Sequence, residues 1–143
     1  MDHVVYVDDK AKEMEKLLDG SQTMIIRGAT GRKLPYGRVH VGDVLYFIRN
    51  NGEGRVSAKA TVNLVLNSEK MEKEQSLQWV EEHQSQLQLS PRQFKKWAGK
   101  RYIVLIGVEN VQPVDPLAID KSGYGNMDDW LPVGDIQTVT PSA

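Results

Sequence analysis

The sequence contains no cysteine, and this absence removes several chemistries at once. Disulfide bridges, zinc–thiolate sites and thiol nucleophiles all need that residue, and nothing points to an oxidising compartment. Long hydrophobic runs are missing too. No stretch approaches the roughly 18 apolar residues of a membrane span, and the opening MDHVVYVDDK lacks the pattern of a secretory signal. We therefore expect no membrane contact, no disulfide-linked partner and a cytoplasmic location.

Motifs for metals, cofactors and covalent catalysis are equally scarce. The three histidines, His3, His40 and His83, lie far apart in the sequence and none has metal-ligand spacing. The run from Gly28 to Lys33 is too short for a phosphate-binding P-loop and lacks the helix that follows one. No serine stands in a nucleophile-elbow context. The sequence predicts no metal site and no cofactor, and it leaves any catalytic residue unknown.

What is present is the composition of an ordinary globular protein. The chain has 143 residues, of which 40% are hydrophobic and 26% are charged. Both fractions are typical of soluble domains, and the length is enough for one buried core. We therefore expect residues 1–143 to form a single domain.

The net charge of −1 conceals two basic segments. Residues 21–60 carry seven bases against two acids, and residues 91–101 carry five bases and no acid. The remaining segments are mostly acidic. Because a long-range field depends on clustering rather than on the sum, a cationic face exists only if the two basic segments meet in space. The alternative is that each segment is a separate solvated surface.

Hydrophobic periodicity and turn residues predict short strands with helices between them. The clearest strand is 55–66, where every second residue is apolar. A loop rich in glycine and basic residues spans 28–42, and Ser90 followed by Pro91 predicts a helix start. Further strands are expected at 3–7, 23–27, 43–49, 101–111 and 135–139, and helices at 10–19, 68–87 and 91–98. Because strands and helices do not alternate regularly, we expect an α+β fold with a compact mixed or antiparallel β-barrel and inserted peripheral helices.

One segment resembles a known family. Residues 20–27 read GSQTMIIR, and Gly42 and Asp43 stand before a later predicted strand. ASCH domains, within the PUA-like superfamily, have a helix, then Gly-x-Lys-x-x-Glu-x-Arg at the start of a strand, a loop, and Gly-Asp before the next strand. The first glycine and Arg27 match this pattern at the expected spacing, and the order of elements agrees over residues 9–112. The resemblance implies a PUA-like fold.

Two departures from the family pattern concern its chemistry. Some small ASCH proteins are amidohydrolases acting on acetylated cytidine, and they use a lysine and a threonine of this strand with a later glutamate. Here Gln22 stands in place of the lysine, and Ile25 stands at both the acid position of the pattern and the threonine position of those enzymes. An amide has no titratable proton near neutral pH, so Gln22 cannot act as a base or nucleophile. The resemblance therefore does not carry that activity to this sequence.

The basic loop after Arg27 suits a ligand that carries phosphates and bases. Arg27 is expected at a strand end facing the barrel mouth, where a guanidinium can grip a phosphate or carboxylate; the alternative is a structural ion pair. Tyr36 or Trp130 would cover a base by stacking. RNA is favoured over duplex DNA because no recognition helix is visible and a stacking pocket suits single strands. We expect RNA or a nucleotide-containing ligand to bind a cationic cleft formed by Arg27, Arg32, Lys33, Tyr36, Arg38, Lys95, Lys100 and Trp130.

Two other functions stay open at this point. One is a hydrolase acting on modified nucleosides or RNA, for which His40 is the remaining general base; whether the protein is an enzyme is left undecided. The other is a module that binds a protein or a small metabolite. Two tryptophans have alternatives as well. Trp97 shares a helix face with Phe94 and is expected in the core, and Trp130, in an acidic loop, could cover the barrel mouth or plug the sheet edge.

Overall fold

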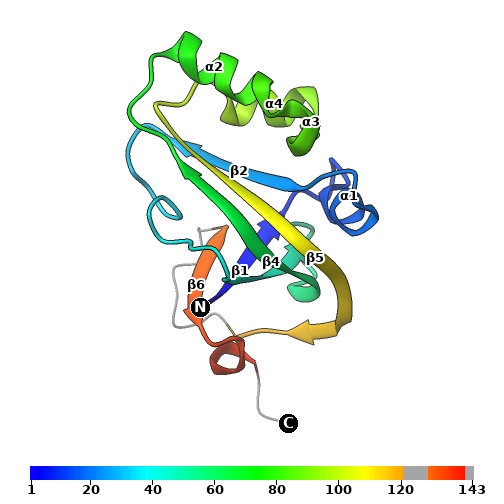
Figure 1. The fold of residues 1–143 in the computed structure, drawn as a ribbon. Coiled ribbons are helices and arrows are strands. Elements are labelled where there is room, and N and C mark those ends of the chain that lie inside the picture. Colours follow the sequence, from blue (N-terminus) through cyan, green and yellow to red (C-terminus); the bar gives the residue numbers. More distant parts are fainter. Residues whose placement is uncertain (121–128, 141–143) are drawn as a thin grey trace.

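A six-stranded sheet, curled into a half barrel, forms the frame of the protein (Figure 1). The computed structural model describes residues 1–120 and 129–140, and its strand order is β2-β5-β4-β3-β1-β6. The strands are β1 (Asp2–Val7), β2 (Met24–Ala29), β3 (Val44–Arg49), β4 (Arg55–Asn67), β5 (Tyr102–Ala118) and β6 (Trp130–Gly134). β1 and β3 pair in parallel, and the other neighbours pair antiparallel. The predicted α+β class with a mixed, barrel-like sheet is confirmed.

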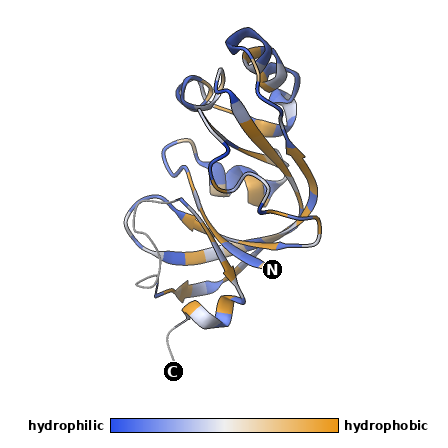
Figure 2. Ribbon diagram, turned by 90° about the vertical axis from the view of Figure 1, so that its left-hand side faces the viewer, coloured by the Kyte–Doolittle hydropathy of each residue, from blue (hydrophilic) through white to orange (hydrophobic). Residues whose placement is uncertain are grey.

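The helices lie around this sheet. They are α1 (Glu13–Asp19), α2 (Lys73–Glu82), α3 (Gln84–Leu87), α4 (Pro91–Trp97) and the short 3-10 helix η1 (Ile136–Val139). α2, α3 and α4 stack beside β2 and β5 (Figure 1), where Val80 and Leu87 pack on Ile26 and Leu105. In Figure 2 these outer helices are largely hydrophilic, whereas the strands are largely hydrophobic. None of the helices in the described part of the chain is long and apolar enough to span a membrane.

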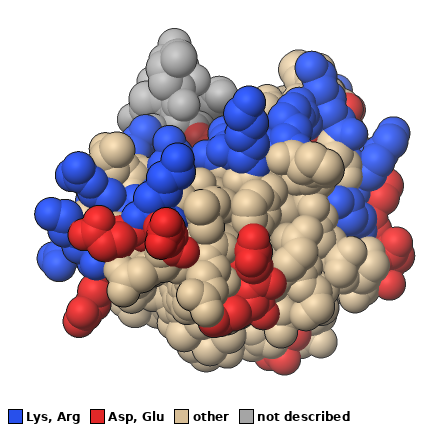
Figure 3. Space-filling model, turned by 90° about the horizontal axis from the view of Figure 1, so that it is seen from above, with Lys and Arg blue, Asp and Glu red and all other residues tan. Residues whose placement is uncertain are grey.

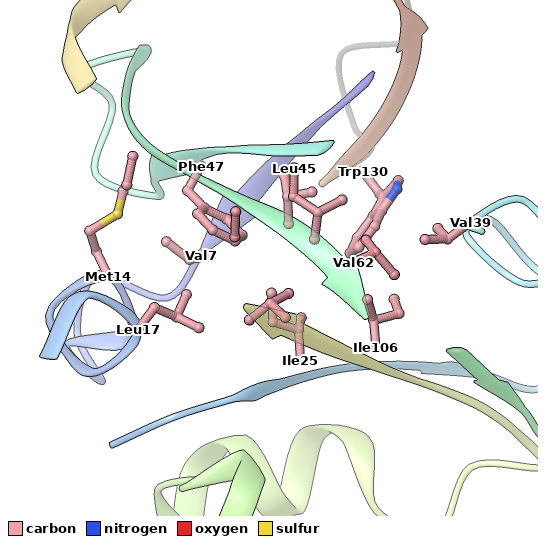
Figure 4. Close-up of a cluster of buried hydrophobic side chains, with 14 of the residues drawn as sticks. Val7, Met14, Leu17, Ile25, Val39, Leu45, Phe47, Val62, Ile106 and Trp130 are labelled. Carbon is pink, nitrogen blue, oxygen red and sulfur yellow. The ribbon is translucent and has the colours of Figure 1, made fainter. Parts of the chain in front are cut away.

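The main core fills the inside of the half barrel (Figure 4). Met14 and Leu17 of α1 close one end of it, and Trp130 of β6 lies at the other end with Val39 of the 30–43 loop. The alternation predicted for 55–66 supplies part of this core, because Ala58, Ala60 and Val62 on β4 all point inward. A strand alternates its side chains between two faces, so one apolar face is enough to anchor it.

Alternation of side chains along β2 likewise decides where Arg27 lies. Along β2, Met24 and Ile26 pack on the outer helices, whereas Ile25 points into the half barrel. Arg27 follows Ile25 by two residues and therefore lies on the inner face as well. Its side chain is 6% exposed. The strand continues to Ala29, so Arg27 is inside the barrel rather than at the last residue of the strand.

Two predicted segments were wrong in detail. Residues 135–139, expected as a strand, form η1, because the carboxylate of Asp135 accepts a hydrogen bond from the Gln137 amide and starts a helical turn. The last strand is β6, immediately before it, which pairs with β1. The predicted helix 68–87 starts only at Lys73, where the side chains of Glu72 and Gln75 form a capping box, and it is divided into α2 and α3.

A bulge in β4 leads to a first testable prediction. The register with β5 shifts between Val62 and Leu64, and Leu64, which the alternation placed inside, is 41% exposed. Its partner Gly107 has no room for a side chain: a Cβ there would lie 2.6 Å from Oδ1 of Asn63 and 3.0 Å from the Cβ of Leu64. We expect Gly107→Ala to lower the free energy of unfolding by about 1–3 kcal/mol, measured by urea denaturation.

Gly31→Ala is the matched control for this substitution. A Cβ at Gly31 would have no atom within 4 Å, so its stability should stay near that of the unmutated protein. An equal loss in both variants would show that the bulge does not restrict residue 107.

Candidate functional site

A pocket of about 410 Å³ opens between β2, the 30–43 loop, α4 and the start of β6. This volume lies within the range of small-molecule sites. The charged side chains that line it are Arg27, Lys33, Lys96 and Asp129, and the aromatic ones are Tyr6, Tyr36, Trp97, Tyr102 and Trp130. Among the described residues, three cations thus face one carboxylate, which gives this part of the cavity a positive character. The two basic segments of the sequence do meet, because Arg27 and Lys33 belong to the first and Lys96 to the second.

Arg27 forms the floor of the pocket. Its Nη1 donates to the carbonyl of Ile26 at 2.8 Å, and its Nη2 donates to the carbonyl of Tyr6 on β1 at 2.7 Å. Its Nε lies 3.2 Å from Oδ2 of Asp129, close enough for an ion pair, yet this buried Nε makes no hydrogen bond. A guanidinium has five N–H donors, so those not used here remain available to a ligand.

Two tryptophans enclose the guanidinium. The Arg27 Cζ lies 5.4 Å from the ring centre of Trp97 and 5.6 Å from that of Trp130, both within the range of a cation–π contact. Trp97 is the last residue of α4, and Trp130 is the first residue of β6. Arg27 therefore joins edge strand β2 to the opposite edge of the sheet and to the helical layer. Ion pairing, one of the alternatives for Arg27, is present, with Asp129 as the partner.

Three further residues form a cluster on the rim. Tyr36 and Tyr102 meet edge to face, with ring centres 5.7 Å apart, and both line the pocket. The Arg32 guanidinium lies 5.7 Å from the ring centre of Tyr36 and 5.6 Å from that of Tyr102. Arg32 itself does not line the cavity, but it is positioned beside it through these two rings.

The other expected site residues fall into two groups. Lys100 lies directly beside the pocket, because a Cβ on the lining residue Gly28 would come within 3.2 Å of its Cβ and Cγ. Arg38 and Lys95 are exposed and lie outside the pocket lining. Figure 3, which looks down on the outer helices, shows Lys and Arg gathered along one margin of this face while its centre is mostly uncharged.

Sequence reasoning missed several residues of the pocket. Lys96, rather than its neighbour Lys95, lines the cavity, and its Nζ lies 4.8 Å from the ring centre of Trp97. Trp97 packs against the outer core as expected, but one part of it also faces the pocket. Tyr102 and Asp129 carried no signal of their own, although Tyr102 stands next to the basic run that ends at residue 101.

Trp130 lies in a strand and not in a loop. It is 1% exposed, and its indole Nε1 donates to Nδ1 of His3 at 3.1 Å. Its position at the sheet edge corresponds to the plug alternative. The preceding residues 121–128, which belonged to the expected lid, lie outside the described part of the chain.

Gln22, the residue that replaces the family lysine, is buried away from this pocket. Its Nε2 donates to Oε2 of Glu13 at 2.8 Å and to the carbonyl of Met24 at 3.0 Å. Glu13 is buried as well, and its other oxygen accepts from the Asp8 amide. The pair ties α1 to the start of β2, so Gln22 has a structural partner here.

Two consecutive buried hydrogen bonds connect Trp130 to His3 and His3 to Asp43. Nδ1 of His3 accepts from the indole, so the ring carries its proton on Nε2, which donates to Oδ2 of Asp43 at 2.8 Å. Burial of the ring outweighs the attraction of Asp43 and lowers the pKa of His3 below 6.5. Burial opposes the charge of Asp43, yet hydrogen bonds from His3 and from the His40 amide outweigh it and lower the pKa of that carboxyl. His3 is thus neutral and Asp43 is ionised.

No group of three histidine, cysteine, aspartate or glutamate residues suited to a metal ion occurs within residues 1–120 and 129–140. His40 and His83, the remaining histidines, do not line the pocket.

Comparison with known proteins finds similarity at the level of structure. No protein-family model and no curated protein matches the sequence. The structure is similar to the crystal structure of ASCH from Zymomonas mobilis, with a TM-score of 0.70 and 12% identity, covering 96% of this chain and 90% of that one. Two mutants of the same protein give TM-scores of 0.69 and 0.70, also at 12% identity, with 96% of this chain and 93% and 91% of theirs covered. Identity this low shows a shared fold and nothing finer.

The buried arginine gives a prediction about stability. Arg27→Ala leaves the Tyr6 carbonyl and Asp129 without their cation and opens a gap between the two indoles. We expect the free energy of unfolding to fall by about 3 kcal/mol in a urea titration, because the substitution leaves the Tyr6 carbonyl without its donor and creates a cavity beside the buried Trp130. Arg38→Ala, at an exposed arginine of the same basic segment, should change it by less than about 0.5 kcal/mol. Similar losses in both variants would contradict a structural role for Arg27.

The His3–Asp43 pair gives a prediction about how the stability of the protein depends on pH. The lowered pKa of His3 means that the unfolded chain takes up a proton near pH 6.5 while the folded chain resists it, so stability falls as the pH drops below that value. The contribution of Asp43, whose pKa is also lowered, is kept above pH 3.8 and lost only in stronger acid. We therefore expect the urea concentration at the unfolding midpoint of the unmutated protein to be lower at about pH 5 than at about pH 7.5.

The His3→Gln variant tests the source of this pH dependence. Glutamine keeps a donor toward Asp43 but does not titrate, so the variant should be less stable overall and lose part of the difference between the two pH values. The charges nearest His3, the Met1 ammonium and the carboxylates of Asp2 and Asp43, are unchanged in it. An unaltered pH difference would assign the effect to other groups.

Proposed function

The chain has the PUA-like fold of the ASCH domains, as its sequence resemblance implied, and from this premise we propose that its pocket binds RNA or another nucleotide-containing ligand. The observation that carries the proposal is the pairing of cations with aromatic rings around one cavity. Arg27 forms the floor, Lys33 and Lys96 lie at the rim, and Tyr36, Trp97 and Tyr102 present rings. Phosphates attract such cations, and bases stack on such rings.

The cavity favours a single strand over a duplex. A volume of about 410 Å³ admits one base with its sugar but no paired helix. A base that enters must be unstacked from its neighbours, which single-stranded RNA permits at little energetic cost. The rest of the strand would then pass Lys33 and Lys96, which are exposed and line the pocket. In this arrangement Arg32 and Lys100 contact the strand next to the bound base, and Arg38 and Lys95 add attraction at longer range.

The roles of the aromatic residues follow from their exposure. Trp130 is fully buried and its indole N–H is already bound, so we assign it the wall behind Arg27. Tyr36 and Tyr102 are half-buried at the rim and offer ring surface to a base. A hydrolase receives less support from the pocket, because Asp129, the one carboxylate among its described lining residues, is paired with Arg27.

Adjacent lysines on α4 provide a matched test of the proposal. Lys96 lines the pocket and Lys95 does not, although both are exposed on the same helix. We expect Lys96→Ala to weaken the binding of a short fluorescent single-stranded RNA on the order of fivefold, or about 1 kcal/mol, at low salt. It should also reduce the slope of log affinity against log salt by roughly 0.7, the value for one phosphate contact on a single strand.

Lys95→Ala is the control and should change the affinity by much less. Lys33→Ala and Arg38→Ala form a second pair of this kind, with Lys33 at the pocket and Arg38 outside it. Binding that is insensitive to salt, or losses that are equal within each pair, would count against phosphate recognition at this pocket.

A further inference from the structure

We propose that the base selected by this pocket is guanine, read by the Asp129 carboxylate and the Arg27 guanidinium acting together. The inference rests on the proposed function, because it specifies which nucleotide that site holds. It goes further in assigning a direction to the ligand, with the base edge at the floor of the pocket and the phosphate at the rim.

The charges of the pocket set this direction. At the floor, the Nε of Arg27 lies 3.2 Å from Oδ2 of Asp129, so the two charges largely neutralise each other. At the rim, Lys33 and Lys96 make no ion pair within the described residues. A phosphate placed at the floor would face the carboxylate of Asp129, whereas at the rim it meets two ammonium groups. The neutral, hydrogen-bonding end of the nucleotide therefore belongs inside.

Asp129 is free to accept hydrogen bonds from that end. Its side chain is 46% exposed and lines the pocket. Oδ2 faces Arg27, and Oδ1 makes no hydrogen bond with any described residue. The Tyr6 amide donates to the Asp129 carbonyl at 2.9 Å. The backbone of Asp129 is thus held in place, and its carboxylate faces the cavity as an acceptor.

Arg27 supplies a donor beside this acceptor. Its Nε is buried and faces Asp129, and two of its four Nη N–H groups are used by the carbonyls of Ile26 and Tyr6, which leaves the other two for a ligand. Trp97 and Trp130 both lie within cation–π distance of the guanidinium and Arg27 is only 6% exposed, so little of its face is open to stacking and a base must approach edge-on. The floor therefore presents carboxylate acceptors next to a guanidinium donor.

Guanine is the base whose edge matches this array. Its N1–H and N2–H₂ are adjacent donors that a carboxylate accepts as a pair, and its O6 acceptor lies beside N1–H where a guanidinium can donate. Adenine and cytosine each place a ring-nitrogen acceptor beside their amino group, and uracil flanks its single N–H with two carbonyls. Each of these would set an acceptor against the carboxylate, which is an unfavourable contact.

The test uses short single-stranded RNAs that are identical except for one central base in an oligouridine background. The central base is guanine, hypoxanthine, adenine, cytosine or uracil, and binding to the full chain is measured by fluorescence anisotropy. We expect the guanine strand to bind about tenfold more tightly than the uracil strand. Hypoxanthine, which lacks only the 2-amino group, should bind with intermediate affinity because it can make one of the two bonds to Asp129.

Asp129→Asn then separates recognition from folding. Asparagine has nearly the same shape but offers one acceptor and one donor, so the preference for guanine over hypoxanthine should disappear. Asp115→Asn, at an exposed aspartate that does not line this pocket, should keep the preference. A purely structural role for Asp129 would instead lower the affinity for all five strands equally, and this result would overturn the inference.

The outcomes distinguish this inference from the function on which it rests. If all five strands bind with equal, salt-dependent affinity, guanine selection is overturned while nucleic-acid binding stands. If none of them binds, both proposals are overturned.

Discussion

The side chain of Arg27 is the interaction on which the rest of the structure depends. A half-barrel sheet has two free edges, here β2 and β6, and an open seam between them. Arg27 crosses this seam, donating to the Tyr6 carbonyl, facing Asp129 and contacting the rings of both Trp97 and Trp130. A buried guanidinium is stable only where carbonyls, a carboxylate and ring faces replace its water. Trp97, Trp130, Asp129 and Tyr6 also line the pocket, so the residue that closes the fold also lies in the candidate site.

Burial divides the site into two environments. Behind Trp130, the His3–Asp43 pair is enclosed and keeps fixed protonation states, with a neutral ring and an ionised carboxyl. In front of it, Lys33 and Lys96 line the pocket and are exposed to solvent. The hydrogen bond from Trp130 to His3 connects the two environments and fixes the plane of the indole against Arg27. The interior therefore sets geometry, and the rim supplies attraction.

Local patterns in the sequence predicted most of the fold but only part of the site. The alternation on β4, the helix start at Ser90 and the run GSQTMIIR all depend on neighbouring residues, so a single sequence reveals them. The strand at Trp130 could not be read in this way, because it is stabilised by pairing with Val5, far away in the chain. The choice of Lys96 over Lys95 depends on how α4 is rotated against β2, which only tertiary packing decides.

The position of β1 has a consequence for the way the chain acquires its structure. This first strand lies between β3 and β6, so one of its edges pairs with residues 44–49 and the other with residues 130–134. During synthesis, the second edge must wait until residues 130–134 have left the ribosome. Until then it presents unpaired amides and carbonyls that other strands can capture. Dilute refolding should thus favour correct assembly, and crowding of nascent chains should favour aggregation.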